Sequence, residues 1–182
     1  MSTEVLFYAG ERLDCSAKPD WGIGQVLADT NESTVEVFFE YFGKISIDTD
    51  RNSVNRVETG GRVHPILDTL LEDLNWKQAH HNVYVVLLEN SVLNHKRFLE
   101  ANRHFISSKP CVYVGLTGLN PEARFRNHKR GYKSNFYVHK YGARLMYDLF
   151  RNFNPMPYRL AQVVEEEMAA RYRALGYGVW QH

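Results

Sequence analysis

The spacing of the hydrophobic residues changes part-way along the chain, and this change most constrains the fold. Within Ser33–Glu40, apolar and polar residues alternate, so that Val35, Val37 and Phe39 share one face. This period of two is typical of a strand with one buried face. Over residues 62–77, apolar residues instead recur at helical intervals. Because 182 residues suffice for two small domains, the change predicts two domains with a helix between them.

The first part of the chain is predicted to be all β. Short apolar runs separated by turn residues predict strands at Ile23–Ala28, Ser33–Glu40, Ile45–Asp48 and Ser53–Val57. Several short strands at close spacing are typical of a small barrel of the SH3 or Tudor type. We therefore expect a β-barrel domain over residues 1–60, a helical connector over 61–81 and an α/β domain over 82–182.

The net charge of +1 conceals an uneven distribution. Residues 1–80 contain 7 Lys and Arg against 14 Asp and Glu, whereas residues 81–182 contain 15 against 7. The basic half favours a polyanionic partner, of which nucleic acid is the first candidate. The two cysteines are far apart in sequence, which excludes a disulfide scaffold and a cysteine zinc site.

The sequence also indicates the compartment. No apolar run approaches the ~18 residues of a membrane helix, and Met1 to Glu4 lack the basic start of a signal peptide. We therefore expect a cytoplasmic protein without a membrane partner.

Strand and helix patterns alternate in the basic half. Val83–Leu88 and Cys111–Gly115 are apolar runs typical of strands. Asn120 and Pro121 are favourable residues for the start of a helix, which should extend to Arg130. Further helices are expected over Val92–Ala101 and Ala161–Leu175.

Basic residues are concentrated between Arg124 and Arg144, where the chain contains no acidic residue. Aromatic residues alternate with them, a combination that suits phosphate contacts and base stacking. The candidate nucleic-acid contacts are Arg126, Lys129, Arg130, Lys133, Lys140 and Arg144. The alternative interpretation is an ordinary solvated helix and loop.

The first half resembles a known type of domain. Asp20–Val26, Val35–Phe39 and Gly43–Lys44 are similar to the Tudor-like domains appended to bacterial helicases and transcription-coupled repair factors. The resemblance implies a docking module for a protein partner. Trp21 has two interpretations, a core aromatic residue of the barrel or part of a ligand cage, and we favour the structural one.

The second half resembles the GIY-YIG nuclease superfamily. The similarity rests on Tyr84 in an apolar strand, Tyr113-Val114-Gly115, the pair Arg124 and His128, and Glu165 on the last helix. It implies a small mixed or antiparallel sheet flanked by helices. It also implies a metal-dependent endonuclease that hydrolyses DNA phosphodiester bonds in repair, recombination or restriction.

The same resemblance implies a role for each residue. Tyr84 would be the general base, Arg124 would stabilise charge on the phosphate, and Tyr113 and His128 would orient the water or the base. Glu165 would bind Mg²⁺ or Mn²⁺. Each residue also has a structural interpretation: the tyrosines as core aromatics, Arg124 as a phosphate anchor and Glu165 as an ion-pair partner.

Two alternatives to a DNA nuclease remain open. The first motif reads Asn82-Val83-Tyr84, without the glycine of the superfamily, and an insertion over 89–110 separates it from Tyr113. A catalytically inactive nucleic-acid-binding module would also fit these residues. The third class is an RNA-directed nuclease, since no residue here distinguishes a 2′-hydroxyl.

Overall fold

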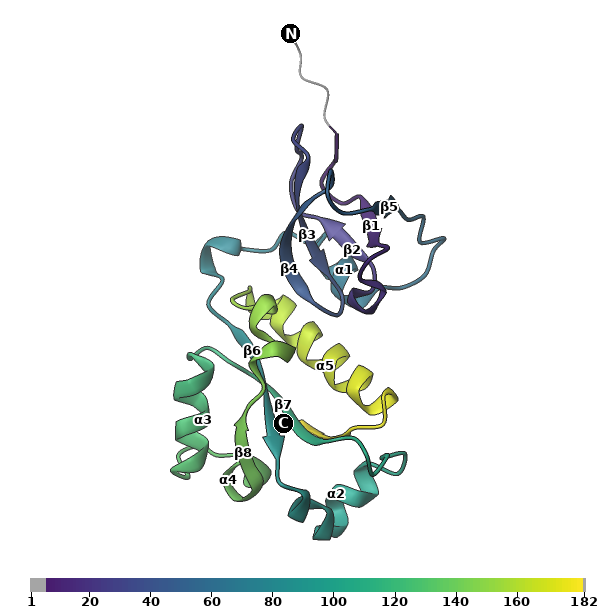
Figure 1. Cartoon of the computed structure of the whole chain (residues 1–182). Helices are drawn as coiled ribbons and strands as arrows, with labels where there is room; N and C mark the ends of the chain where they lie inside the picture. Colours follow the sequence, from purple (N-terminus) through teal and green to yellow (C-terminus); the bar gives the residue numbers. More distant parts are fainter. Residues whose placement is uncertain (1–5, 182) are drawn as a thin grey trace. The chain divides into compact units, whose positions relative to one another are not determined.

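The computed structural model describes residues 6–181, and the chain divides into two compact units between Leu74 and Asn75. Each unit contains one sheet (Figure 1). The predicted combination of a β-rich N-terminal region with a mixed α/β region is confirmed. The division lies inside the predicted connector. Met1 to Glu4, whose sequence predicts that a signal peptide is absent, lie outside the described residues.

The first unit is built on a five-stranded antiparallel sheet in the order β4-β3-β2-β1-β5. Its strands are β1 (Arg12–Cys15), β2 (Gly24–Val26), β3 (Thr34–Phe39), β4 (Gly43–Asp48) and β5 (Val54–Arg56). Four of these correspond to predicted strands. The sequence did not predict β1, which pairs with both β2 and β5.

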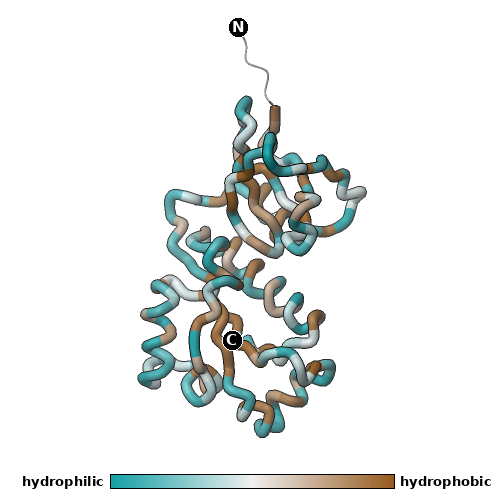
Figure 2. Tube along the Cα trace, in the orientation of Figure 1, coloured by the Kyte–Doolittle hydropathy of each residue, from teal (hydrophilic) through white to brown (hydrophobic). Residues whose placement is uncertain are grey.

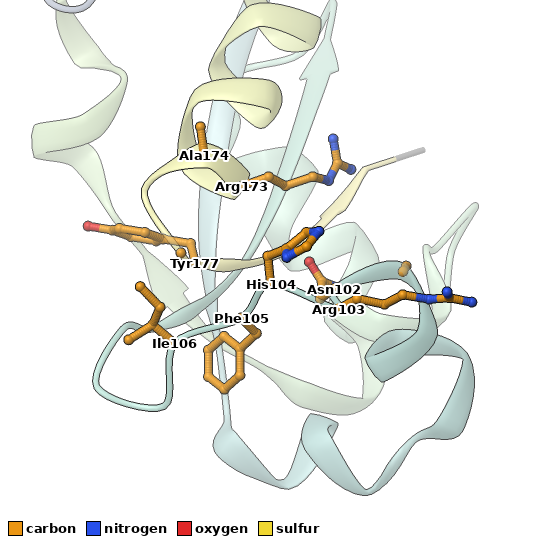
Figure 3. Close-up of a pocket in the computed structure, with 10 residues that line it drawn as sticks. Asn102, Arg103, His104, Phe105, Ile106, Arg173, Ala174 and Tyr177 are labelled. Atoms are coloured by element: carbon orange, nitrogen blue, oxygen red, sulfur yellow. The ribbon is translucent and has the colours of Figure 1, made fainter.

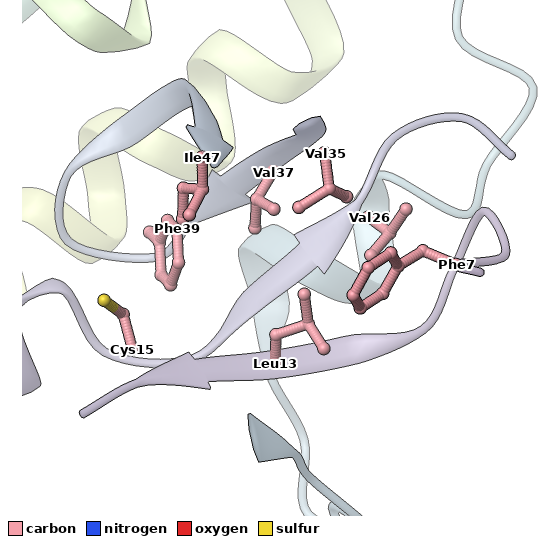
Figure 4. Packing of buried hydrophobic residues seen from close by; sticks show 8 residues of the cluster. All are labelled: Phe7, Leu13, Cys15, Val26, Val35, Val37, Phe39 and Ile47. Atoms are coloured by element: carbon pink, nitrogen blue, oxygen red, sulfur yellow. The ribbon is translucent and has the colours of Figure 1, made fainter. Parts of the chain in front are cut away.

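The alternating residues of β3 form the core of the first unit. Val35, Val37 and Phe39 are fully buried and meet Leu13 of β1 and Val26 of β2 (Figure 4). Burial of such side chains is the main stabilising contribution to a small sheet.

Trp21 packs against the edge of this core. Its ring stacks on Phe42 with the ring centroids 4.2 Å apart and meets Phe39 edge-on at 5.3 Å. A pair of this geometry adds to the area that the rings bury. Trp21 therefore contributes to packing, which agrees with its structural interpretation.

The connecting helix is much shorter than the sequence pattern predicts. Helix α1 spans only Pro65–Thr69, and Leu71 is 62% exposed. Glu72 and Asp73 follow at its C-terminal end, where the helix dipole disfavours negative charge. The prediction of one helix over 62–77 is therefore wrong.

The second unit is an α/β structure with a four-stranded sheet in the order β8-β6-β7-β9. Its strands are β6 (Asn82–Leu88), β7 (Cys111–Thr117), β8 (Gly142–Leu145) and β9 (Gly178–Gln181). Only β9 is parallel to its neighbour. The hydrophobic colouring of Figure 2 follows β6 and β7, which are almost wholly buried.

Four helices accompany this sheet: α2 (Lys96–Ala101), α3 (Pro121–Lys129), α4 (Phe136–Tyr141) and α5 (Tyr158–Ala174). Helix α3 begins as predicted, because the Asn120 side chain accepts hydrogen bonds from the backbone N–H groups of Glu122 and Ala123. Helix α5 packs on β7 and β9, and α3 packs on β6 and β8. Helices α3 and α5 therefore both pack against the central strands, α3 against β6 and α5 against β7.

Membrane insertion through a helix finds no support in the described residues. None of the helices within 6–181 combines the length and the apolar character needed to cross a bilayer.

Candidate functional site

The two central strands bring two tyrosines together. Tyr84 of β6 lies opposite Gly115 of β7, and Tyr113 is two residues before that glycine. Residues two apart on a strand point to the same face, so the tyrosines are diagonal neighbours. Their ring centroids are 5.8 Å apart. Both rings are buried.

Gly115 allows this arrangement because it has no side chain. A Cβ atom at this position would lie 2.6 Å from Cε1 of Tyr113 and 2.9 Å from its hydroxyl oxygen. These distances are shorter than van der Waals contact. The Tyr113 ring thus lies over the glycine backbone, beside Tyr84.

Helix α3 adds a third ring. His128 is fully buried, with its ring centroid 6.1 Å from that of Tyr84 and 5.9 Å from that of Tyr113. Its Nε2 atom lies 2.8 Å from the Tyr84 hydroxyl. Arg124 is one helical turn earlier and half-buried, so it shares this face of α3.

The hydrogen bonds of His128 determine its protonation. The backbone N–H of Asn135 donates to Nδ1 at 2.9 Å. Burial, and secondarily the charge of Arg124, lower the pKa of His128 to about 4. The ring is therefore neutral near pH 7, and its single proton is on Nε2. Nε2–H donates to the Tyr84 oxygen, which leaves the Tyr84 hydroxyl proton free to point elsewhere.

Opposing influences act on the Tyr84 phenol. Burial raises its pKa above the ordinary value, while hydrogen bonding to Tyr113 and the positive charge of Arg124 oppose that rise. Burial also raises the pKa of Tyr113. Both phenols are therefore protonated near pH 7, unless further positive charge is brought to them.

Helix α5 contributes a buried carboxyl group. Glu165 is 6% exposed, and burial, followed by the neighbouring charge of Glu166, raises its pKa to about 7. Its negative charge raises the pKa of both Tyr84 and Tyr113. A buried carboxylate without a cation is costly. We call Tyr84, Tyr113, Arg124, His128 and Glu165 the five-residue cluster.

The cluster offers few ligands to a metal ion. No three His, Cys, Asp or Glu side chains within residues 6–181 lie close enough to hold a metal together. This excludes a tetrahedral protein cage of the zinc type in that part of the chain. Mg²⁺ keeps several of its waters and binds through one or two carboxylates, so Glu165 suits that ion.

The six predicted nucleic-acid contacts lie outside the cluster, on or beside α3, α4 and β8. All six side chains are exposed: Arg126, Lys129, Arg130, Lys133, Lys140 and Arg144. The Lys129 amine donates to the carbonyl oxygens of Gly142 and His139 at 2.8 and 3.2 Å. Lys129 therefore links α3 to the end of α4, while the other five residues extend the basic surface.

Sequence reasoning missed two asparagines that support the cluster. The Asn154 side chain accepts from the backbone N–H of Val83 at 2.9 Å and donates to its carbonyl at 2.7 Å. It thereby satisfies the backbone hydrogen-bonding groups of β6 next to Tyr84, where β6 no longer pairs with β8. Asn135 positions His128 through its backbone. Neither role has a local sequence signal, because each depends on a distant partner.

Comparison with known proteins corrects the two resemblances. Residues 8–57 match a family described as "Protein of unknown function (DUF3553)", and no match to the GIY-YIG nucleases is found. The resemblances of the first half to Tudor-like domains and of the second half to GIY-YIG nucleases are therefore wrong. Both rested on motifs of a few residues each, which also occur by chance.

The other comparisons add no relatives. No curated protein and no solved structure matches the chain.

Proposed function

We propose that the second unit is a metal-dependent endonuclease that hydrolyses phosphodiester bonds of DNA. The observation that carries this proposal is the convergence of a guanidinium, two phenols, a neutral imidazole and a carboxyl group in the five-residue cluster. The exposed basic residues of α3, α4 and β8 supply a surface for the phosphate backbone.

Each residue has a chemical task in this proposal. A water molecule that attacks phosphorus transfers its proton to the oxygen of deprotonated Tyr84. The Nε2–H of His128 and the charge of Arg124 both stabilise that phenolate. Arg124 also stabilises the negative charge that develops on the phosphate. The Tyr113 hydroxyl orients Tyr84 or the water.

Glu165 is the residue that would hold Mg²⁺ or Mn²⁺. A bound divalent ion would supply positive charge for the leaving oxygen. The raised pKa of Glu165 supports this assignment, because burial and the charge of Glu166 disfavour the carboxylate form, which a bound cation would stabilise. Ionised Glu165 would then be stable near pH 7.

The test is a cleavage screen of the full-length protein over plasmid, nicked, flapped and branched DNA, with Mg²⁺ or with EDTA. We expect cleavage only with Mg²⁺. Tyr84→Phe and Glu165→Gln should each reduce the rate by at least about 100-fold, because each removes a group needed in the transition state.

Two matched variants serve as controls. Glu166→Gln removes the exposed carboxyl next to Glu165, and Tyr172→Phe removes a buried phenol outside the cluster. Both should cleave at nearly the wild-type rate. Absence of cleavage on every substrate, or a Glu165→Gln variant as active as Glu166→Gln, would refute the assignment.

A second candidate is a catalytically inactive nucleic-acid-binding module. The raised pKa of Tyr84 favours it, since a protonated phenol cannot act as a base. Salt-dependent DNA binding without cleavage in Mg²⁺ or Mn²⁺ would select this candidate. Competition between labelled DNA and RNA in the same assays distinguishes an RNA-directed nuclease.

A further inference from the structure

A cavity of about 360 Å³ lies at the C-terminal end of α5, outside the five-residue cluster. Two segments line it: residues 101–106, which follow α2, and residues 173–177, where α5 ends (Figure 3). Cavities of this size hold ligands as large as a nucleotide. Arg173 is eight residues after Glu165 on the same helix, which corresponds to about 12 Å along the axis. The cavity is therefore separate from the cluster.

The two segments are held together by hydrogen bonds. The backbone N–H of Ile106 donates to the carbonyl of Gly176 at 2.8 Å. The Asn102 side chain accepts from the backbone N–H of Val179 at 2.7 Å and donates to the carbonyl of Phe98 at 2.9 Å. Gly176 also allows close packing, since a Cβ there would lie 2.4 Å from Ile106. The walls of the cavity are thus fixed before any ligand binds.

The polar residues of the cavity are predominantly basic. Arg103, His104 and Arg173 line it, and its lining contains no acidic residue. Neither arginine forms an ion pair with a carboxylate anywhere in residues 6–181. Arg173 is half-buried and donates to the Gln181 side chain at 2.9 Å. Burial lowers the pKa of Arg173. A partly buried guanidinium without an acidic partner is stabilised by an anion.

The cavity has a polar and an apolar side. In Figure 3 the charged ends of Arg103 and Arg173 point to the same side, to the right, and the His104 ring lies between the two arginines. Tyr177 and Ile106 lie on the opposite, left side, and Phe105 lies below. A free phosphate would use only the first side. A ligand that fills both sides needs an anionic group and a flat apolar body.

We propose that this cavity binds one nucleotide unit. Its phosphate lies against Arg103, His104 and Arg173, and its base lies against the wall formed by Phe105, Ile106 and Tyr177. The nucleotide is either a free mononucleotide or part of a single strand, since both present the same groups. This site is independent of phosphodiester hydrolysis, and Tyr84→Phe should bind as the wild type does.

The test is calorimetric titration of the full-length protein, in EDTA, with adenosine monophosphate, thymidine monophosphate, inorganic phosphate and a short single-stranded DNA. We expect saturable binding of a mononucleotide or of the single strand. Arg103→Gln should weaken this binding about 10-fold, the effect of losing one hydrogen bond to a charged group. Because Arg103 is exposed, the substitution should leave the fold intact.

Arg151→Gln is the matched control, because Arg151 is another exposed arginine of the second unit. Ile106→Ser should weaken mononucleotide binding and leave the affinity for inorganic phosphate unchanged. If the protein binds the single-stranded DNA but no mononucleotide, and Arg103→Gln weakens that binding, the cavity binds a nucleotide that is part of a strand. No saturable binding, an equal loss in Arg151→Gln, or phosphate binding as tight as the mononucleotide would overturn the proposal.

Discussion

The hydrogen-bond partners of His128 fix the protonation state of its ring. The Asn135 backbone occupies Nδ1 and the Tyr84 hydroxyl lies at Nε2, so both ring nitrogens are satisfied without a charge. A protonated ring would lose the bond from Asn135, because both nitrogens would then be donors. The folded protein therefore holds His128 neutral, and that state has a consequence for stability.

Glu165, whose pKa is raised to about 7, makes the second unit more stable as the pH falls from about 7 to about 4.5, because the folded protein binds that proton first. His128 has the opposite effect as the pH falls from about 6.5 to about 4. In this window an unfolded histidine binds a proton, whereas folded His128, with its pKa of about 4, does not. The His128 contribution therefore favours the unfolded state by up to about 3 kcal/mol below pH 4, and it largely offsets the contribution of Glu165. Native-state hydrogen exchange of the β6 amides measures this change for the second unit alone.

The contribution of His128 is isolated by substitution. His128→Gln should leave the Glu165 contribution unopposed, so that stability rises more steeply on acidification than in the wild type, whatever the effect of the substitution at neutral pH. His104→Gln removes an exposed histidine of the same unit and should keep the wild-type slope. An unchanged slope in His128→Gln would contradict the assignment of a neutral buried ring.

At the scale of elements, β6 and β7 were predictable because their apolar runs are continuous and end at turn residues. Strands β1, β8 and β9 were missed. Each takes its strand conformation from pairing with a neighbouring strand. Helix α3 was predicted well because Asn120 and Pro121 mark its start locally.

The β6–β7 pair depends on the missing side chain of Gly115. In Gly115→Ala, the new Cβ would collide with the Tyr113 ring, so the ring must move away from Tyr84. We expect a loss of stability of about 1–3 kcal/mol and a slower cleavage reaction, measured by thermal unfolding and by plasmid nicking.

Gly118→Ala is the control for that substitution. The nearest atom to a Cβ at Gly118 is Nε2 of His81, at 3.7 Å, which is an ordinary contact. This variant should unfold and cleave almost as the wild type does. Equal effects of the two substitutions would show that Gly115 has no special role.

At the scale of the whole molecule, the two units differ sharply in charge. The basic residues of the second unit include several exposed lysines near aromatic rings: Lys133 lies 5.7 Å from the Tyr132 ring and Lys140 lies 5.6 Å from the Phe136 ring. Both Tyr132 and Phe136 are exposed. Such pairs suit contact with a phosphate and a base together.

Removing these charges should reduce the salt dependence of DNA binding. The double variant Lys133→Gln, Lys140→Gln should lower the slope of log K against log salt concentration by about 1 to 2, since each phosphate contact contributes about 0.7 to 0.9. Fluorescence anisotropy at several salt concentrations measures the slope.

A double variant of the first unit provides the comparison. Lys44→Gln with Arg51→Gln removes two exposed charges that are paired with Glu36 and Asp48. Its slope should equal that of the wild type. An equal reduction in both double variants would mean that net charge alone, and not the surface of α3 and α4, governs binding.

The sequence by itself determined the features that depend on neighbours along the chain. These are the alternating strand Thr34–Phe39, the two central strands of the second unit, the capped start of α3 and the separation of charge between the halves. The expected helix over 62–77 is realised only over Pro65–Thr69.

Only the tertiary structure decided what happens between distant residues. His128 meets Tyr84 from 44 positions away, and Asn154 binds Val83 from 71 positions away. Burial then shifts the pKa of His128 and of Glu165 in opposite directions. No local pattern encodes these contacts, because hydrogen bonding and desolvation depend on which segments pack together.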